Sequence, residues 1–129
     1  MNRAERAVEI KHSGSNCCQA VLLAFAEELG AEELGAEEDT LRKMGAAFGC
    51  GMGTFDATCG ALCGAGMILG LKKYGGRPVL ADAKQLHSSF RSMCGSTDCG
   101  ELKGVKTGKM LCSCDDCVRN AVKLAEAFI

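Results

Sequence analysis

Apolar residues recur along much of this chain at the three- and four-residue spacing of one helix face. The segment 17–29 has Val21, Leu22, Phe25 and Leu29 at this spacing, and the segment 79–93 repeats the pattern. Four further segments are helix candidates, covering residues 2–11, 39–48, 59–74 and 113–128. Together these segments predict an all-α protein, a compact bundle of about five to six helices.

Small and polar residues separate the predicted helices. A Ser-Gly-Ser break precedes the second helix, which Ser15 or Asn16 can cap because their side-chain oxygens accept bonds from free backbone amides. Thr58 is placed to cap the fourth helix in the same way. The duplicated AEELG of residues 26–38 is acidic and interrupted by glycines, so we expect a frayed helix end and an exposed connection.

Two segments read as loops. Residues 49–60, GCGMGTFDATCG, are rich in glycine and predict a Gly/Cys-rich loop. Residues 94–104 form a second, polar loop that contains Cys94 and Cys99. Gly60 and Gly64 leave a smooth groove on the fourth helix. This groove suits close helix packing, or the approach of backbone to a cofactor or to another chain.

Composition supports a helical single domain. The chain has 129 residues, of which 47% are hydrophobic, so one core and one domain over residues 1–129 are expected. Aromatic residues make up only 5%, and there is no Trp. β-Branched and aromatic residues, which favour strands, are sparse.

Charge and hydropathy exclude several functions. The formal net charge is −1, which provides no basic surface for nucleic acid, and the lysines between Lys103 and Lys109 read as a solvated loop. No apolar run approaches the ~20 residues that cross a membrane. The charged N-terminus does not resemble a signal peptide. We therefore expect a cytoplasmic protein with reduced thiols.

Cysteine is the unusual component of the sequence. The chain has ten cysteines, and clustered cysteines in a cytoplasmic protein indicate metal binding or redox chemistry. Most lie where predicted helices begin, where free amides and the helix dipole stabilise a thiolate. The cysteines at such junctions are Cys17, Cys18, Cys59, Cys112, Cys114 and Cys117.

Other candidate residues carry weaker signals. Cys114 and Cys117 form a CxxC, a spacing that lets two sulfurs share a metal or close a disulfide. Val118 follows it, so it is not a haem-attachment motif. We interpret Cys50, Cys63 and Cys94, each taken singly, as packing or loop residues. Neither histidine has a predicted role, and no phosphate-binding loop is present.

The sequence CGALCG at residues 59–64 matches the motif CGAxxG, and with the other cysteines the chain resembles the C-GCAxxG-C-C family of redox-active proteins. Asn16-Cys17 resembles the first cysteine segment of the family, GSTDCGEL around Cys99 the third, and Cys117 the fourth. FGCGMG at residues 48–53 is similar to the family's glycine-rich FGGGMG, with Cys50 in place of a glycine. The resemblance implies a redox function and selects Cys17, Cys59, Cys99 and Cys117.

Three hypotheses follow. In the first, Cys17, Cys59, Cys99 and Cys117 converge to hold an iron–sulfur cluster, or zinc, for electron transfer or redox sensing with a partner protein. The amides around Gly49, Gly51 and Gly60 would then bond the sulfurs. In the second, no cofactor is bound: Cys59 is a nucleophile, and a second cysteine, for which Cys17 is the candidate, resolves the mixed disulfide. In the third, the protein is a helical interaction module, such as a homodimer that packs through the glycine groove.

Overall fold

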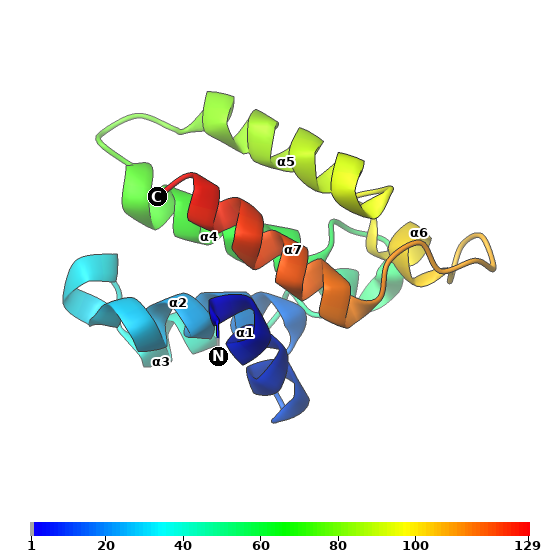
Figure 1. Cartoon of the computed structure of the whole chain (residues 1–129), viewed down its shortest axis with the longest axis horizontal. Helices are drawn as coiled ribbons and strands as arrows, with labels where there is room; N and C mark the ends of the chain where they lie inside the picture. Colours follow the sequence, from blue (N-terminus) through cyan, green and yellow to red (C-terminus); the bar gives the residue numbers. More distant parts are fainter. Residues whose placement is uncertain (1) are drawn as a thin grey trace.

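The computed structural model describes residues 2–129, and this part of the chain is all-helical (Figure 1). The prediction of an all-α protein is confirmed, and each of the six predicted helices is present. Two additional short elements, the π-helical turn η1 and the helix α6, occupy the two predicted loops. The elements are α1 (Arg3–His12), α2 (Cys17–Leu34), α3 (Glu38–Gly45), η1 (Gly51–Phe55), α4 (Gly60–Lys73), α5 (Leu80–Cys94), α6 (Cys99–Lys103) and α7 (Cys114–Ala127).

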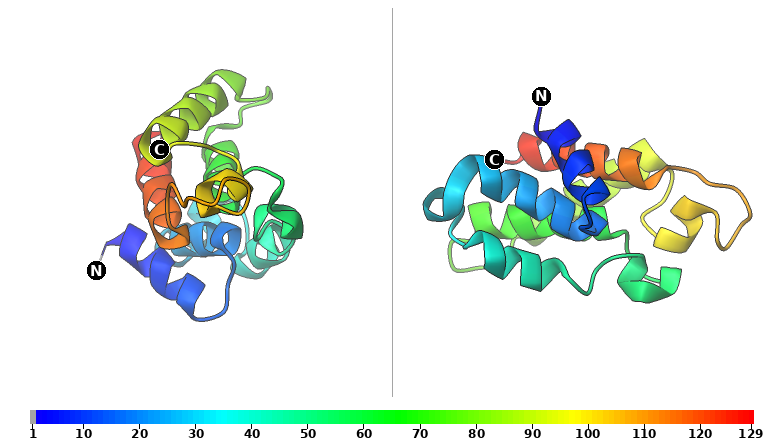
Figure 2. Two further views of the ribbon diagram at one scale, coloured as in Figure 1. Left: turned by 90° about the vertical axis from the view of Figure 1, so that its right-hand side faces the viewer. Right: turned by 90° about the horizontal axis from the view of Figure 1, so that it is seen from below.

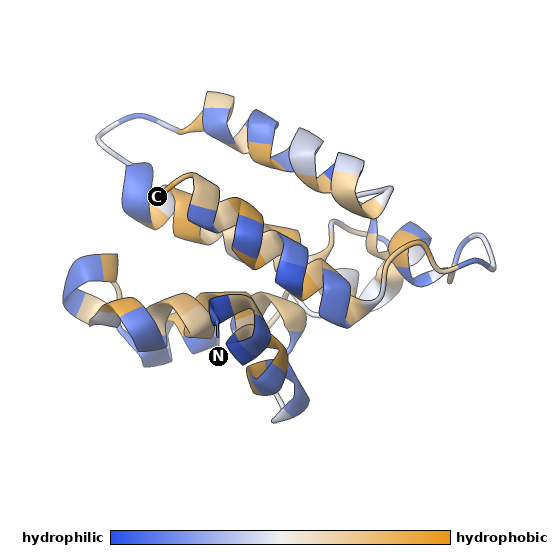
Figure 3. Cartoon of the chain, in the orientation of Figure 1, coloured by the Kyte–Doolittle hydropathy of each residue, from blue (hydrophilic) through white to orange (hydrophobic). Residues whose placement is uncertain are grey.

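Helix α2 is the centre of the bundle. It packs against α1, α3, α4 and α7, while α5 lies on the outer side of α4 and α7 (Figures 1 and 2). Every residue from Ala20 to Ala26 is buried, so this part of α2 is covered on all sides. The outer helices are amphipathic and turn their apolar faces inward (Figure 3). None of the helices in the described range has the length and apolar content needed to cross a membrane.

The end of α2 differs from the prediction. The helix continues past a kink at Gly30, where φ is 81° and ψ is 160°, and ends at Leu34. Leu34 is buried in the core, so its burial holds the last turn in place instead of letting the chain fray. Gly35, also at positive φ, then ends the helix as a left-handed cap.

The glycine groove of α4 is filled from within the chain. A Cβ placed on Gly60 would collide with the carbonyl oxygen of Phe48, and one on Gly64 would lie 2.9 Å from the carbonyl oxygen of Cys18. The absent side chains therefore allow α2 and the segment before η1 to pack against the beginning of α4. A dimer of this protein would have to use another surface.

Replacing Gly60 with alanine should destabilise the protein by about 2 kcal/mol, because the new methyl group has a backbone carbonyl, not a movable side chain, as its neighbour. Chemical unfolding would measure this. Gly66→Ala is the matched control, since a Cβ there meets nothing within 4 Å and alanine favours helix. Equal stability of the two variants would show that the close approach at Gly60 has no energetic weight.

The turn η1 is built from left-handed backbone. Cys50, Met52 and Phe55 have φ values of 52°, 57° and 59°, an uncommon conformation for residues other than glycine. Gly51 lies so close to α6 that a Cβ there would be 2.8 Å from the Cβ of Cys99. The turn therefore covers the beginning of α6 and places it beside the beginning of α4.

Candidate functional site

The beginnings of four helices meet at one end of the bundle, which faces the viewer in the left part of Figure 2. Each of these beginnings carries cysteine. Cys17, Cys99 and Cys114 are the first residues of α2, α6 and α7, Cys59 immediately precedes α4, and Cys117 lies in the first turn of α7. We refer to these five residues as the cysteine centre.

Polar caps fix three of these helix beginnings. Asn16 and Gln19 form a reciprocal capping box at α2, Asp98 accepts from the amide of Glu101 at α6, and Ser113 accepts from that of Asp116 at α7. The position before α4 has no capping oxygen. Cys59 occupies it, with its sulfur facing the amides of Ala61 and Leu62. The prediction of Thr58 as the cap was therefore wrong.

Thr58 has a different role, because it pairs with Asp98 in an isolated antiparallel bridge. The amide of Cys59 donates to the carbonyl of Thr97 over 2.8 Å, and the amide of Cys99 donates to that of Ala57 over 2.9 Å. This short pairing joins the beginning of α4 directly to that of α6. It brings Cys59 and Cys99 to the same end of the bundle.

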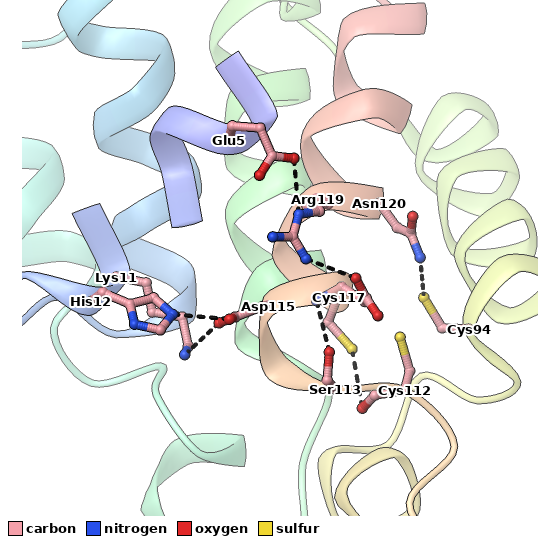
Figure 4. Close-up of polar contacts among 11 residues, drawn as sticks. Glu5, Lys11, His12, Cys94, Cys112, Ser113, Asp115, Cys117, Arg119 and Asn120 are labelled. Carbon is pink, nitrogen blue, oxygen red and sulfur yellow. Dashed lines mark hydrogen bonds and ion pairs between the residues drawn. The ribbon is translucent and has the colours of Figure 1, made fainter. Parts of the chain in front are cut away.

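Ion pairs between α1 and α7 hold the beginning of α7 (Figure 4). Asp115 accepts from Lys11 at 2.8 Å and from His12 at 2.9 Å, and Arg119 donates to Glu5 at 2.9 Å. These contacts position the first turn of α7 next to the end of α1. Cys114 and Cys117 are held in place with it.

Lys103, the last residue of α6, supplies the positive charge of the cysteine centre. Its Nζ donates to the sulfur of Cys117 over 3.3 Å. Burial alone would lower the pKa of Lys103, but its position beside Cys117, Cys59 and Cys114 raises that pKa overall. The prediction that Lys103 belongs to a solvated loop was wrong, because a short helix turns its side chain toward the sulfurs.

Cys59 and Cys117 form the first of two thiol pairs. The neighbouring side chain of Cys117, aided by the charge of Lys103, lowers the pKa of Cys59 to about 6. The amides of Leu62 and Ala61 act in the same direction. The neighbouring Cys59, together with burial, raises the pKa of Cys117. Cys59 is therefore the member of the pair that loses its proton first.

Cys17 and Cys114 form the second pair. The neighbouring side chain of Cys17 lowers the pKa of Cys114 to about 5, with Lys103 and Lys11 contributing further. The pKa of Cys17 is raised by Cys114 and by burial. Cys99 lies near Cys59, and burial raises its pKa to about 11.

A third group of sulfurs adjoins the cysteine centre. The sulfur atoms of Cys94, Cys112 and Cys117 all lie within 4.8 Å of one another (Figure 4). Cys94 ends α5, and the Asn120 amide nitrogen on α7 donates to its sulfur over 3.3 Å. We refer to these three cysteines as the sulfur triad.

We compared the sequence with models of known protein families, with curated proteins and with solved structures. The model of one family, described as "Putative redox-active protein (C_GCAxxG_C_C)", matches residues 15–128. The chain belongs to this family. No match was found among the curated proteins or the solved structures.

The cysteines selected by resemblance to the C_GCAxxG_C_C family lie at one end of the bundle. Cys59 is a direct neighbour of Cys117. Its negative charge also raises the pKa of Cys17 and of Cys99. The direct partner of Cys17, however, is Cys114, which the resemblance to the family did not select. The CxxC spacing of Cys114 and Cys117 was the signal that could have identified it.

The three glycines predicted to approach a cofactor approach other parts of the chain. A Cβ on Gly49 would lie 2.7 Å from that of Asn16, one on Gly51 would meet Cys99, and one on Gly60 would meet Phe48. These glycines thus allow the loop and helix beginnings of this family member to close around the cysteine centre. The backbone amides of these glycines can donate to a cysteine sulfur only if their N–H groups point toward it.

Three cysteines lie outside both sulfur groups. Cys50 is exposed, Cys63 is half-buried one turn after Cys59, and Cys18 is buried in the core. Burial raises the pKa of Cys18 to about 12. The interpretation of Cys94 as a packing residue is incomplete, since this buried residue also has two sulfur neighbours.

Proposed function

We propose that this protein is an electron-transfer or redox-sensing protein whose cysteine centre holds an iron–sulfur cluster. The observation that supports this most directly is the meeting of five cysteines at the beginnings of four helices, with one lysine between them. Thiolates are the usual ligands of such clusters. The cysteine sulfurs of the centre are therefore suitable ligands for an iron–sulfur cluster.

Cys17, Cys59, Cys99 and Cys117 would be the four ligands, with Cys114 available beside Cys17. The cluster would supply one-electron transfer. The chain supplies negative sulfur ligands, and it balances their charge with the Lys103 ammonium and with the amides at the beginning of α4. Positive charge and N–H donors near sulfur favour the reduced, more negative form, so these groups would raise the reduction potential.

Protein purified without oxygen should contain iron and acid-labile sulfide and have a visible charge-transfer spectrum. Cys59→Ser should abolish the iron content, because it removes the ligand held by α4 and by the bridge to α6. Cys50→Ser is the matched control, since Cys50 is exposed in the neighbouring turn, and it should retain the iron.

Full metal retention in Cys59→Ser would contradict the proposed ligand set. Stoichiometric zinc without iron would replace the cluster with a redox-inert site. A colourless, metal-free protein would favour the second candidate below.

The second candidate is metal-free dithiol chemistry, and the Cys59–Cys117 pair supports it. The Cys59 thiolate would attack a substrate disulfide, form a mixed disulfide and release one substrate thiolate. Cys117, after losing its proton, would then attack the sulfur of Cys59 and release the second substrate thiolate. The two cysteines would be oxidised to a disulfide while the substrate disulfide is reduced by two electrons.

A further inference from the structure

The sulfur triad joins three segments that are distant in the sequence. Cys94 ends α5, Cys112 lies in the segment before α7, and Cys117 is in the first turn of α7. Cys94 and Cys117 are buried and Cys112 is half-buried, so the group is largely shielded from solvent. Their sulfurs all lie within 4.8 Å of one another, so one ion could contact all three.

Two side-chain N–H groups support the triad from outside. The Asn120 Nδ2 donates to Cys94, and the Lys103 Nζ donates to Cys117, each over 3.3 Å. Asn120 follows Cys117 by three residues on α7, so it lies on the same helix face. Donors of this kind orient sulfur ligands and stabilise them as thiolates, the form that binds metal.

The spacing and the charge of the triad suit a divalent cation. Zinc binds thiolate sulfur at about 2.3 Å, which places tetrahedral ligands about 3.8 Å apart. The triad would need to contract by at most about 1 Å to reach that spacing. Three thiolates, one divalent ion and the Lys103 ammonium sum to zero, whereas a monovalent ion would leave one negative charge unbalanced.

We propose that Cys94, Cys112 and Cys117 form a second metal site of this protein, a three-thiolate site for zinc with its fourth position open to water. The site goes beyond the proposed cluster and shares only Cys117 with it. When zinc occupies the triad, Cys117 would bind it instead of pairing with Cys59.

The test is zinc titration of the reduced, metal-free protein, with alkylation of each cysteine followed by peptide mass spectrometry. Zinc should slow the alkylation of Cys112 at least about tenfold, because a metal-bound sulfur is no longer a free nucleophile. The exposed Cys50 should be unaffected. Cys94→Ser should remove the protection of Cys112, and Asn120→Leu, which keeps all three sulfurs, should weaken zinc binding about ten- to a hundredfold.

Cys17→Ser separates this proposal from the proposed cluster. It removes one ligand of the cluster and none of the triad, so iron should be lost while zinc still protects Cys112. If saturating zinc protects Cys17 and Cys59 but leaves the alkylation of Cys112 unchanged, the triad is not a metal site. Unchanged zinc affinity in both Cys94→Ser and Asn120→Leu would overturn the proposal equally.

Discussion

Replacing Lys103 with methionine is expected to raise the pKa of Cys59 and to slow its alkylation about tenfold near pH 6, because an opposite charge within a few ångströms lowers a pKa by one to three units. Methionine keeps an apolar stem of similar length and removes only the ammonium group that faces the sulfurs. The pKa of Cys59 lies at about 6, so half of its thiol is ionised there. Any upward shift then lowers the thiolate fraction directly.

The measurement is the pH dependence of Cys59 alkylation in reduced, metal-free protein, resolved by peptide mass spectrometry. Lys109→Met is the matched control, since Lys109 is exposed in the segment that follows α6. The Lys109→Met variant should show the same inflection point as wild type in the pH dependence of Cys59 alkylation. An identical inflection in wild type and Lys103→Met would show that the amides and the Cys117 thiol stabilise the thiolate without help from the lysine.

The helices of this fold could be predicted from local signals, but the two short elements could not. The apolar period identifies α2 and α5, and the capping residue Asn16 identifies where α2 begins. Helix α6 has only five residues and η1 depends on left-handed backbone. Both are held by contacts with distant segments, chiefly the pairing of Thr58 with Asp98, which no local pattern contains.

The same distinction applies to the candidate site. Cys17, Cys59 and Cys117 could be predicted because each lies at a helix beginning, a feature visible in the sequence. Lys103 could not, because its role depends on α6, an element that the sequence does not predict.

The sulfur triad depends on three-dimensional proximity even more strongly. Cys94 ends one helix and Cys112 lies in the irregular segment before another, so neither has a local pattern that links it to Cys117. The close approaches at Gly60 and Gly51 show a second limit of prediction from sequence. A glycine indicates that something approaches the backbone, but the sequence does not say whether that is a cofactor or the chain itself.

The reduced, metal-free protein should become more stable as the pH rises from about 6 to about 9, by a few kcal/mol, since one pKa unit corresponds to about 1.4 kcal/mol. The pKa of Cys59 is about 6 in the folded protein, against an ordinary value of 9.0. Between these values the unfolded chain holds a proton that the folded protein has released. Raising the pH removes that proton from the unfolded chain and therefore favours folding.

Cys114 contributes in the same direction from about pH 5, although solvent screening reduces its effect because it is only half-buried. Above about pH 9 the sign reverses. Cys17, Cys99 and Cys117 have raised pKa values, so the unfolded chain loses protons that the folded protein keeps. Stability should therefore pass through a maximum near pH 9.

Urea unfolding at a series of pH values, with reductant and chelator present, would measure this profile. Carboxylates and lysines titrate outside the interval from 6 to 9, so they do not set its slope. Cys59→Ser should make the rising limb shallower and leave only the contribution of Cys114, and Cys50→Ser should preserve the limb. A free energy of unfolding that stays constant or falls between pH 6 and 9 would mean that Cys59 remains a thiol in the folded protein, and both the electrostatic role of Lys103 and the dithiol chemistry would lose their basis.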